Sequence, residues 1–236
     1  MARPASQRVI ESELLDTLPA NDPRAIASRS DLVRVNAVMF QSAIMTRLMR
    51  TNLERKPLRI LELGAGDGRF MLSVARRLGK GWSNVELVTL DQADLMTPKV
   101  RADFDLLGWR VKPVVADVFD WIDKPQDGRF DAVTTNLFLH HFTELQLRNL
   151  LAAMSGVTPC FLATEPRRSG LALWSTGWLR AIGANDVTLH DSAASVRAGF
   201  SGRELSRLWP RQSAMNLDER RVGPFTHAFA ARAADR

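Results

Sequence analysis

The chain is poor in the residues that mark disulfide scaffolds, metal centres and membrane spans. Its 236 residues include one cysteine, Cys160, so no disulfide can form within the chain. Four scattered histidines and that cysteine give no metal-ligand spacing, and no metal site is expected. No apolar stretch reaches the roughly 18 residues that a membrane helix needs. The N-terminal residues also lack the apolar segment of a signal peptide, so we expect a cytoplasmic protein without a transmembrane segment.

The remaining composition is that of an ordinary globular domain. Hydrophobic residues make up 45% of the chain and charged residues 25%. A length of 236 residues suits one α/β domain with additions rather than two full domains. The net charge of +6 is uneven, because residues 57–166 carry 12 basic and 14 acidic side chains whereas residues 167–236 carry 11 and six. The basic flanks could attract an anionic substrate or nucleic acid, but a solvated arginine-rich surface is the simpler interpretation.

The most informative stretch runs from residue 58 to 70 and reads LRILELGAGDGRF. Its apolar first half is typical of a buried strand, and the residues after it repeat at helical spacing. Alternating glycines between the two, Gly64, Gly66 and Gly68, allow a sharp backbone turn and a close approach to a ligand. This order of strand, glycine turn and helix predicts the opening unit of a nucleotide-binding α/β sheet.

The glycine spacing narrows the choice of ligand. The third glycine of a dinucleotide fingerprint, G-x-G-x-x-G, would fall on Arg69, which weakens the case for a nicotinamide enzyme. The stretch instead reads E-x-G-x-G-x-G from Glu62, which resembles motif I of the class I S-adenosylmethionine (SAM) dependent methyltransferases. That resemblance implies SAM as the cofactor, with Glu62, Gly64, Ala65 and Gly66 among the residues that bind it.

Polar residues end the later predicted strands and extend the resemblance over about residues 58–166. Asp91 ends the run 85–90, where a carboxylate can accept hydrogen bonds from both ribose hydroxyls; Gln92 follows it in the same expected site. Asp117 ends the third run, and in the family an acid at this place binds the adenine amino group beside the backbone of the next residue, here Val118. Asn136 ends the fourth run and is also expected to bind the cofactor.

The strand and helix alternation predicts an α/β fold with a Rossmann-like, seven-stranded, mostly parallel sheet. Residues 215–222 and 225–231 read as a closing hairpin that supplies an antiparallel last strand. Residues 1–56 are interpreted as an N-terminal arm and cap helices, and residues 57–236 as the SAM-binding domain. Within that domain, residues 167–212 are the variable region expected to form the substrate pocket.

The expected catalytic base lies in the stretch NLFLHHF, which starts at Asn136. Small-molecule methyltransferases commonly have a similar stretch after the fourth strand, and histidine titrates near neutrality. We therefore expect His140 or His141 to face the pocket, although a structural role is as plausible. Other possible bases are His190 beside Asp191, and Glu165 at a strand end. His227 alternates with phenylalanines and reads as a strand residue.

Further candidates flank the predicted sheet. Trp174 and Trp178 are four residues apart and could share a helix face, either in the core or as an aromatic wall for a flat substrate. Arg34 and Asn36 could reach the carboxylate of the cofactor, but solvated helix positions are the simpler interpretation.

These features predict a SAM-dependent methyltransferase that acts on an oxygen or carbon of a small aromatic, quinone or polyketide-like molecule. The protein could act as a homodimer. The stretch after the fourth strand lacks the (N/D)-P-P-(Y/F) motif of enzymes that methylate base amines, so a nucleic-acid partner is not expected. The alternatives are an RNA or protein methyltransferase, which the basic flanks would favour, and a non-catalytic SAM-binding partner protein.

Overall fold

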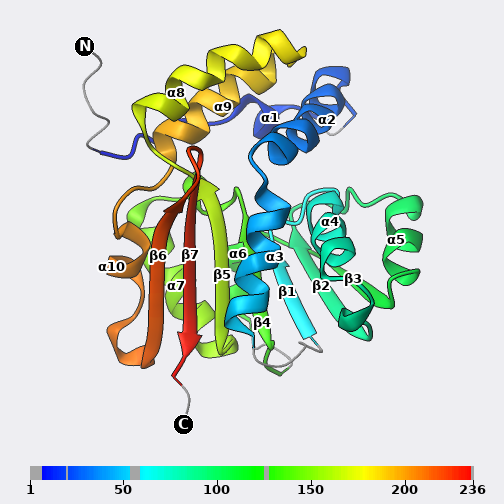
Figure 1. Ribbon diagram of the computed structural model, residues 1–236, viewed down its shortest axis with the longest axis vertical. Coiled ribbons are helices and arrows are strands. Elements are labelled where there is room, and N and C mark those ends of the chain that lie inside the picture. Colours follow the sequence, from blue (N-terminus) through cyan, green and yellow to red (C-terminus); the bar gives the residue numbers. More distant parts are fainter. Residues whose placement is uncertain (1–6, 20, 54–58, 125–127, 235–236) are drawn as a thin grey trace.

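The computed structural model describes residues 7–19, 21–53, 59–124 and 128–234. A seven-stranded sheet runs through the molecule in the order β3-β2-β1-β4-β5-β7-β6 (Figure 1). The strands are β1 (Arg59–Leu63), β2 (Val85–Asp91), β3 (Trp109–Val115), β4 (Ala132–Asn136), β5 (Cys160–Pro166), β6 (Met215–Val222) and β7 (Thr226–Ala233).

The predicted topology is confirmed. Strands β1 to β5 pair in parallel, and β7 pairs antiparallel with both β5 and β6. The first two strands of the chain lie beside each other and β4 flanks β1, so the strand order reverses at β1. Ligands of open parallel sheets bind beside such a reversal, at the carboxyl ends of the strands.

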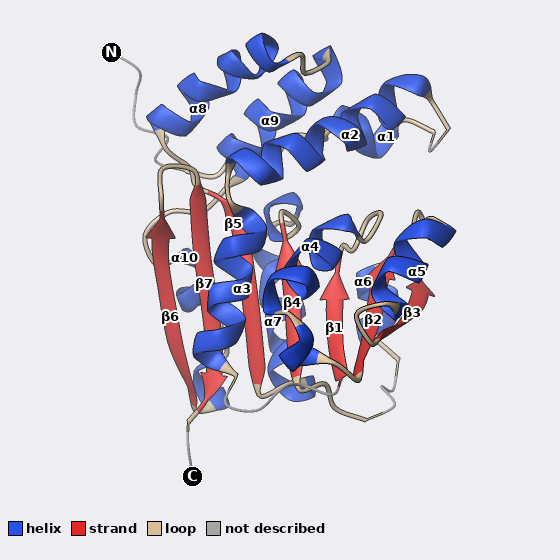
Figure 2. Cartoon of the chain, turned by 45° about the vertical axis from the view of Figure 1, so that its right-hand side comes forward, coloured by secondary structure: helices blue, strands red, loops and turns tan. Residues whose placement is uncertain are grey.

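Helices cover both faces of the sheet and the space beyond its strand tips (Figure 2). The α-helices are α1 (Leu14–Thr17), α2 (Pro23–Val38), α3 (Gln41–Asn52), α4 (Arg69–Leu78), α5 (Pro98–Asp105), α6 (Val118–Ile122), α7 (Glu144–Val157), α8 (Gly170–Thr176), α9 (Asp186–Ala198) and α10 (Glu204–Leu208). The 3-10 turns are η1 (Lys80–Trp82), η2 (Leu139–His141), η3 (Gly177–Ile182) and η4 (Arg211–Ser213). No helix among the described residues is long and apolar enough to cross a membrane.

The inner strands β1, β2, β4, β5 and β7 are buried on both faces, which explains why they are largely apolar. Leu61 and Leu63 of β1 point into a core shared with α6, α7 and α10. Ile60, between them in the pleat, points into the opposite core, formed with α3, α4 and α5. Glu62 therefore shares the face of Ile60, toward α3 and α4, and this orientation matters for the site described below.

A helical cap made of α1, α2, α8 and α9 lies beyond the carboxyl ends of the parallel strands (Figure 2). Its helices come from both ends of the sequence and pack around α9. A buried carboxylate joins them: Asp31 of α2 accepts hydrogen bonds from the Asn185 backbone N–H at 2.8 Å and from the Thr188 hydroxyl at 3.0 Å. The cap is thus held over the edge of the sheet where ligands are expected.

Polar side chains define the starts of three helices. Asp22 accepts a hydrogen bond from the Arg24 N–H at the start of α2. Thr143, the residue before α7, forms a full capping box with Gln146, whose side-chain oxygen accepts a hydrogen bond from the Thr143 N–H. Thr97 caps α5, and Pro98 is the first residue of that helix.

Candidate functional site

The glycine turn that joins β1 to α4 has the backbone conformation that its sequence predicts. Gly64, Gly66 and Gly68 all have positive φ angles, at 66°, 54° and 76°. A Cβ atom on Gly64 would stand 2.4 Å from the ring of Phe138, whereas one on Gly66 would meet nothing within 4 Å. The turn is therefore closed on the side of the loop after β4 and open at its middle, where a ligand can approach the backbone.

Replacement of Gly64 by alanine should consequently be far more damaging than its chemistry suggests. The added methyl group would both clash with Phe138 and hold a left-handed backbone that alanine disfavours by about 1–2 kcal/mol. We expect Gly64→Ala to lower the unfolding free energy by at least about 2 kcal/mol. Urea denaturation measures this change, and Gly156→Ala, at an exposed position of α7 where a Cβ has open space, is the control. Equal stabilities of the two variants would contradict the packing described.

Asp91, at the tip of β2, is tied to this turn. Its Oδ2 accepts a hydrogen bond from the Gly66 N–H at 2.8 Å, and its Oδ1 is 3.4 Å from the Ala93 N. A hollow lies beside it between the tips of β2 and β3, lined by Ala65, Gly66, Thr89, Asp91, Ala93, Asp94, Met96, Pro113, Val114 and Val115. Each carboxylate oxygen has a second lone pair free for a ribose hydroxyl.

The residues predicted to hold the adenine follow the end of β3. Asp117 caps α6 by accepting the Phe119 N–H at 2.8 Å through Oδ1. Its Oδ2 accepts a hydrogen bond from the Gln92 amide at 3.1 Å, which brings the ends of β2 and β3 together. Val118, which follows Asp117, is buried. The structure thus assembles at one edge of the sheet the residues from Gly64 to Val118 that the motif resemblance assigns to the cofactor.

Glu62 offers a direct test of whether these residues fit that cofactor. Its side chain is 2% exposed, and Oε2 has no hydrogen-bond partner among the described residues. Burial, and secondarily the nearby charge of Asp91, raise the pKa of this carboxyl well above its usual value. A buried carboxyl oxygen that lacks a donor is unfavourable unless a ligand supplies one, and the α-ammonium group of SAM is such a donor. Glu62 therefore fits a cofactor that carries an ammonium group, as SAM does.

The loop after β4 is organised by Glu165, a fully buried residue of β5. One carboxylate oxygen accepts the N–H groups of Phe138 and Leu139, at 3.0 and 2.9 Å. The other lies 2.8 Å from Nδ1 of His140. The side chain of Thr164, also in β5, is 2.8 Å from Oδ1 of Asn136 and fixes the tip of β4. Both carboxylate oxygens of Glu165, which was considered above as a possible base, are thus engaged in hydrogen bonds that hold η2 and the residue before it.

His140 lies between two carboxylates. Its Nε2 is 3.3 Å from Oε1 of Glu13, a residue of the N-terminal segment, and its side chain is 3% exposed. Burial alone would disfavour the charged ring, but the hydrogen bonds to Glu13 and Glu165 raise the pKa of His140 to about 9. The ring is therefore an imidazolium at neutral pH and has no lone pair with which to accept a proton. His141, whose ring centroid is 4.2 Å away, is only partly buried.

The raised pKa of His140 predicts a specific pH dependence of stability. Because the pKa of His140 in the folded protein exceeds the ordinary histidine value of 6.5, the stabilisation is complete below about pH 6.5 and is lost as the pH rises through about 9. At 1.36 kcal/mol per pK unit, the unfolding free energy should fall by about 3 kcal/mol over that interval. Urea titrations at pH 6, 7.5 and 9 measure it. His140→Ala should flatten the profile while His190→Ala retains it; a profile unchanged in His140→Ala would contradict the assignment.

Glu13, His140 and His141 each place one potential ligand atom within 4.8 Å of the others. Both ring nitrogens of His140 already lie within hydrogen-bond distance of a carboxylate, Nδ1 of Glu165 and Nε2 of Glu13. Glu13 also accepts a hydrogen bond from Ser195 of α9 and is thereby held to the cap. Sequence reasoning missed Glu13, because 127 residues separate it from His140 and no local pattern marks it.

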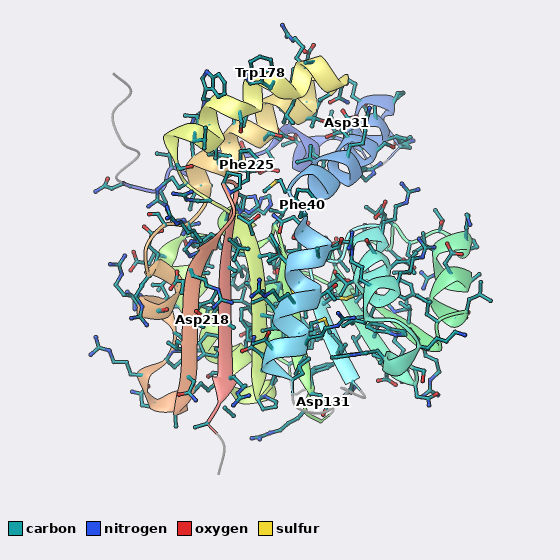
Figure 3. All side chains as sticks on the ribbon, in the orientation of Figure 1. Asp31, Phe40, Asp131, Trp178, Asp218 and Phe225 are labelled. Atoms are coloured by element: carbon teal, nitrogen blue, oxygen red, sulfur yellow. The ribbon has the colours of Figure 1, made fainter. Side chains whose placement is uncertain are left out.

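The structure does not bring the two predicted substrate tryptophans to the strand tips. Trp174 and Trp178 are 65% and 61% exposed and contact each other edge to face at 5.7 Å. Figure 3 shows Trp178 on the outer side of the cap, away from the sheet. Arg34 forms an ion pair with Asp31, and the side chain of Asn36 lies outside the described residues.

A second hollow lies at the opposite end of the strands from the hollow beside Asp91. It is lined by Trp121, Ile122, Lys124, Gly128, Arg129, Ala153, Met154, Gly156 and Val157. These residues come from the end of α6, the end of α7 and the approach to β4, near the amino ends of the parallel strands. No glycine turn or strand-tip carboxylate adjoins it, so we do not assign the cofactor to it.

Comparison with known proteins supports the same interpretation. Residues 60–159 match a family model described as a methyltransferase domain. No curated protein matches the chain in sequence. Among solved structures, the plantazolicin methyltransferase BpumL in complex with S-adenosylhomocysteine (SAH) has a TM-score of 0.63 and 13% identity, over 91% of this chain and 92% of that one.

Two longer proteins share the fold. A putative O-methyltransferase from Nostoc punctiforme has a TM-score of 0.59 and 14% identity over 95% of this chain. An O-methyltransferase family protein from Burkholderia thailandensis has a TM-score of 0.57 and 18% identity over 92% of this chain. This chain spans 64% and 62% of their respective lengths. At these identities the similarity establishes the fold and leaves the substrate open.

Proposed function

We propose that this chain, whose residues 60–159 match a methyltransferase domain, is a class I SAM-dependent methyltransferase that transfers the methyl group of SAM to an oxygen or carbon of a small aromatic, quinone or polyketide-like molecule. The observation that carries the proposal is the carboxylate of Asp91, hydrogen-bonded to the Gly66 N–H at the tips of adjoining strands. It supports a ribose site next to an open glycine turn. The solved O-methyltransferases with this fold favour oxygen as the acceptor.

Bound SAM supplies an electrophilic methyl carbon on a sulfonium that leaves as a neutral thioether. The protein's part is to hold the acceptor in line and to exclude water, and such positioning can contribute roughly 7–11 kcal/mol to lowering the barrier. A hydroxyl acceptor must also lose its proton. His140 is already protonated, so the partly buried His141 beside it is the residue to which we assign proton removal.

Methyl transfer from isotopically labelled SAM to a panel of phenols and hydroquinones tests this proposal. Wild-type protein should label at least one of them, and His141→Ala should lower its turnover by about 10²–10⁴-fold with unchanged SAH affinity. His190→Ala, which removes a half-exposed histidine paired with Asp191, is the matched control and should retain activity. Wild-type turnover in His141→Ala would contradict the assignment of His141 as the base.

The positive charge of residues 167–236 favours RNA as a second class of acceptor. RNA retained at moderate salt with a steep salt dependence would support that alternative. Tight SAH binding without turnover on any acceptor would instead support a non-catalytic SAM-binding protein. We also propose the division into an N-terminal arm with cap helices (1–56) and a SAM-binding domain (57–236), and a homodimer, which light scattering would test.

A further inference from the structure

A buried glutamine at the start of α3 has no hydrogen-bond partner. Gln41 is 0% exposed, and neither the oxygen nor the nitrogen of its amide is hydrogen-bonded among the described residues. Buried amides in native proteins are almost always paired, because an unpaired one loses its hydration without compensation. An orphaned primary amide therefore indicates that something outside the described chain completes it.

The position of Gln41 relates it to the strand tips. On α3 it stands one turn before Met45 and two turns before Leu48, so these residues share one face of the helix. Met45 and Leu48 pack in the same core as Ile60 of β1 and Leu162 of β5, which shows that this face is turned toward the sheet. Gln41 is the polar residue that begins the apolar face.

The strands change from apolar to polar at the corresponding end of that face. Two residues beyond Ile60 is Glu62, whose Oε2 also lacks a partner, and two residues beyond Leu162 is the buried Thr164. Thr164 is joined in turn to Asn136 at the tip of β4. Asn52 at the end of α3 lies beside Cys160 at the start of β5, so the amino end of α3 lies toward the carboxyl ends of the strands (Figure 1). The helix therefore has an unpaired amide, and β1 an unpaired carboxyl oxygen, at the same end of the sheet.

The amino end of α3 adds a further feature that favours an anion. Its N-cap residue, Phe40, makes no side-chain cap, and the first turn contains no acidic residue. The partial positive charge and free N–H groups of such a helix end attract a carboxylate. Phe40 has a φ angle of 55° and is 68% exposed at the turn between α2 and α3 (Figure 3).

We propose that Gln41 and the amino end of α3 bind the α-carboxylate of the cofactor's amino-acid portion, opposite Glu62, which receives its α-ammonium group. A zwitterionic amino acid complements this pair, because it brings an acceptor to the amide and a donor to the carboxyl. The proposal rests on the function proposed above and adds the residue that distinguishes the amino-acid end of the cofactor. Because Gln41 is fully buried, binding requires that the side chains around it move to admit the carboxylate.

Two ligands and two variants test the proposal. SAH carries the amino-acid portion, whereas 5′-methylthioadenosine keeps the nucleoside and lacks that portion. Gln41→Met replaces the amide with an apolar chain of similar size. By calorimetry it should bind SAH about tenfold or more weakly and methylthioadenosine within about twofold of wild type. The apoprotein should melt at the same or a higher temperature, because a buried unpaired amide is removed.

Ser206→Ala is the matched control, since Ser206 also has a buried hydroxyl without a partner but lies in α10, away from the strand tips. It should leave the affinities for both ligands unchanged. SAH affinity unchanged in Gln41→Met would overturn the proposal, as would an equal loss for both ligands, which would indicate a purely structural role. If the wild-type protein does not bind SAH, the proposed function itself is overturned. The wild-type titration therefore separates that outcome from a failure of the Gln41 proposal.

Discussion

Replacing Asp91 with alanine is expected to weaken SAH binding by at least about 100-fold. The carboxylate is the acceptor that we assign to both ribose hydroxyls, and a hydrogen bond to a charged group contributes about 1.5–3 kcal/mol. The substitution also removes the bond between Oδ2 and the Gly66 N–H, which fixes the middle of the glycine turn. Calorimetric titration with SAH measures the loss, and circular dichroism verifies that the sheet remains folded.

Two further substitutions separate the ribose contact from a general effect of charge. Asp94→Ala removes a carboxylate that lines the same hollow but pairs with Arg101, so SAH affinity should change little. Asp91→Asn keeps one oxygen for the Gly66 N–H and should bind with intermediate affinity. Wild-type affinity in Asp91→Ala would refute the assignment of the ribose site to the tip of β2.

Replacing Glu165 with alanine is expected to have the largest effect on stability, a loss of about 3–5 kcal/mol. The substitution would leave the N–H groups of Phe138 and Leu139 without their acceptor and a buried imidazolium at His140 with one carboxylate instead of two. Because Phe138 also packs against Gly64, the disturbance should spread to the glycine turn. Urea denaturation at pH 7 measures the change in unfolding free energy.

Glu144→Gln provides the comparison for this result. Glu144 also carries an ion pair, to Arg148, but its side chain is 68% exposed, so its removal should change stability by less than about 1 kcal/mol. Comparable losses in the two variants would show that burial of Glu165 does not organise the loop. A stable Glu165→Ala protein with an intact His140 titration would contradict the scaffold role directly.

The sheet could be predicted closely because its signals are local. Each parallel strand is a short apolar run bounded by a turn signal, and Asp91, Asp117 and Asn136 fall at or just after three of the strand ends. The glycine turn follows from residue type alone, since positive φ angles suit glycine. Helix α9, by contrast, was not predicted: its residues show no clear apolar period, and it is held by polar contacts such as that of Thr188 with Asp31.

The role of the histidine pair could not be predicted, because it depends on partners far away in the sequence. Nothing local distinguishes His140 from His141, yet His140 is hydrogen-bonded to Glu13, far before it in the sequence, and to Glu165, which follows it by 25 residues. The spacing of Trp174 and Trp178 predicted a shared face, and they do contact each other, but on the surface. A spacing of four residues predicts that two side chains share a face of a helix, but it does not show whether that face packs against the protein or lies in solvent.

A crystal structure of the protein grown with SAH tests the central claim most directly. The account predicts the ribose hydroxyls on the carboxylate of Asp91, the adenine beside Asp117, and the thioether over the open glycine turn at Gly66. SAH bound instead in the hollow between the ends of α6 and α7, or absent at saturating concentration, would contradict it.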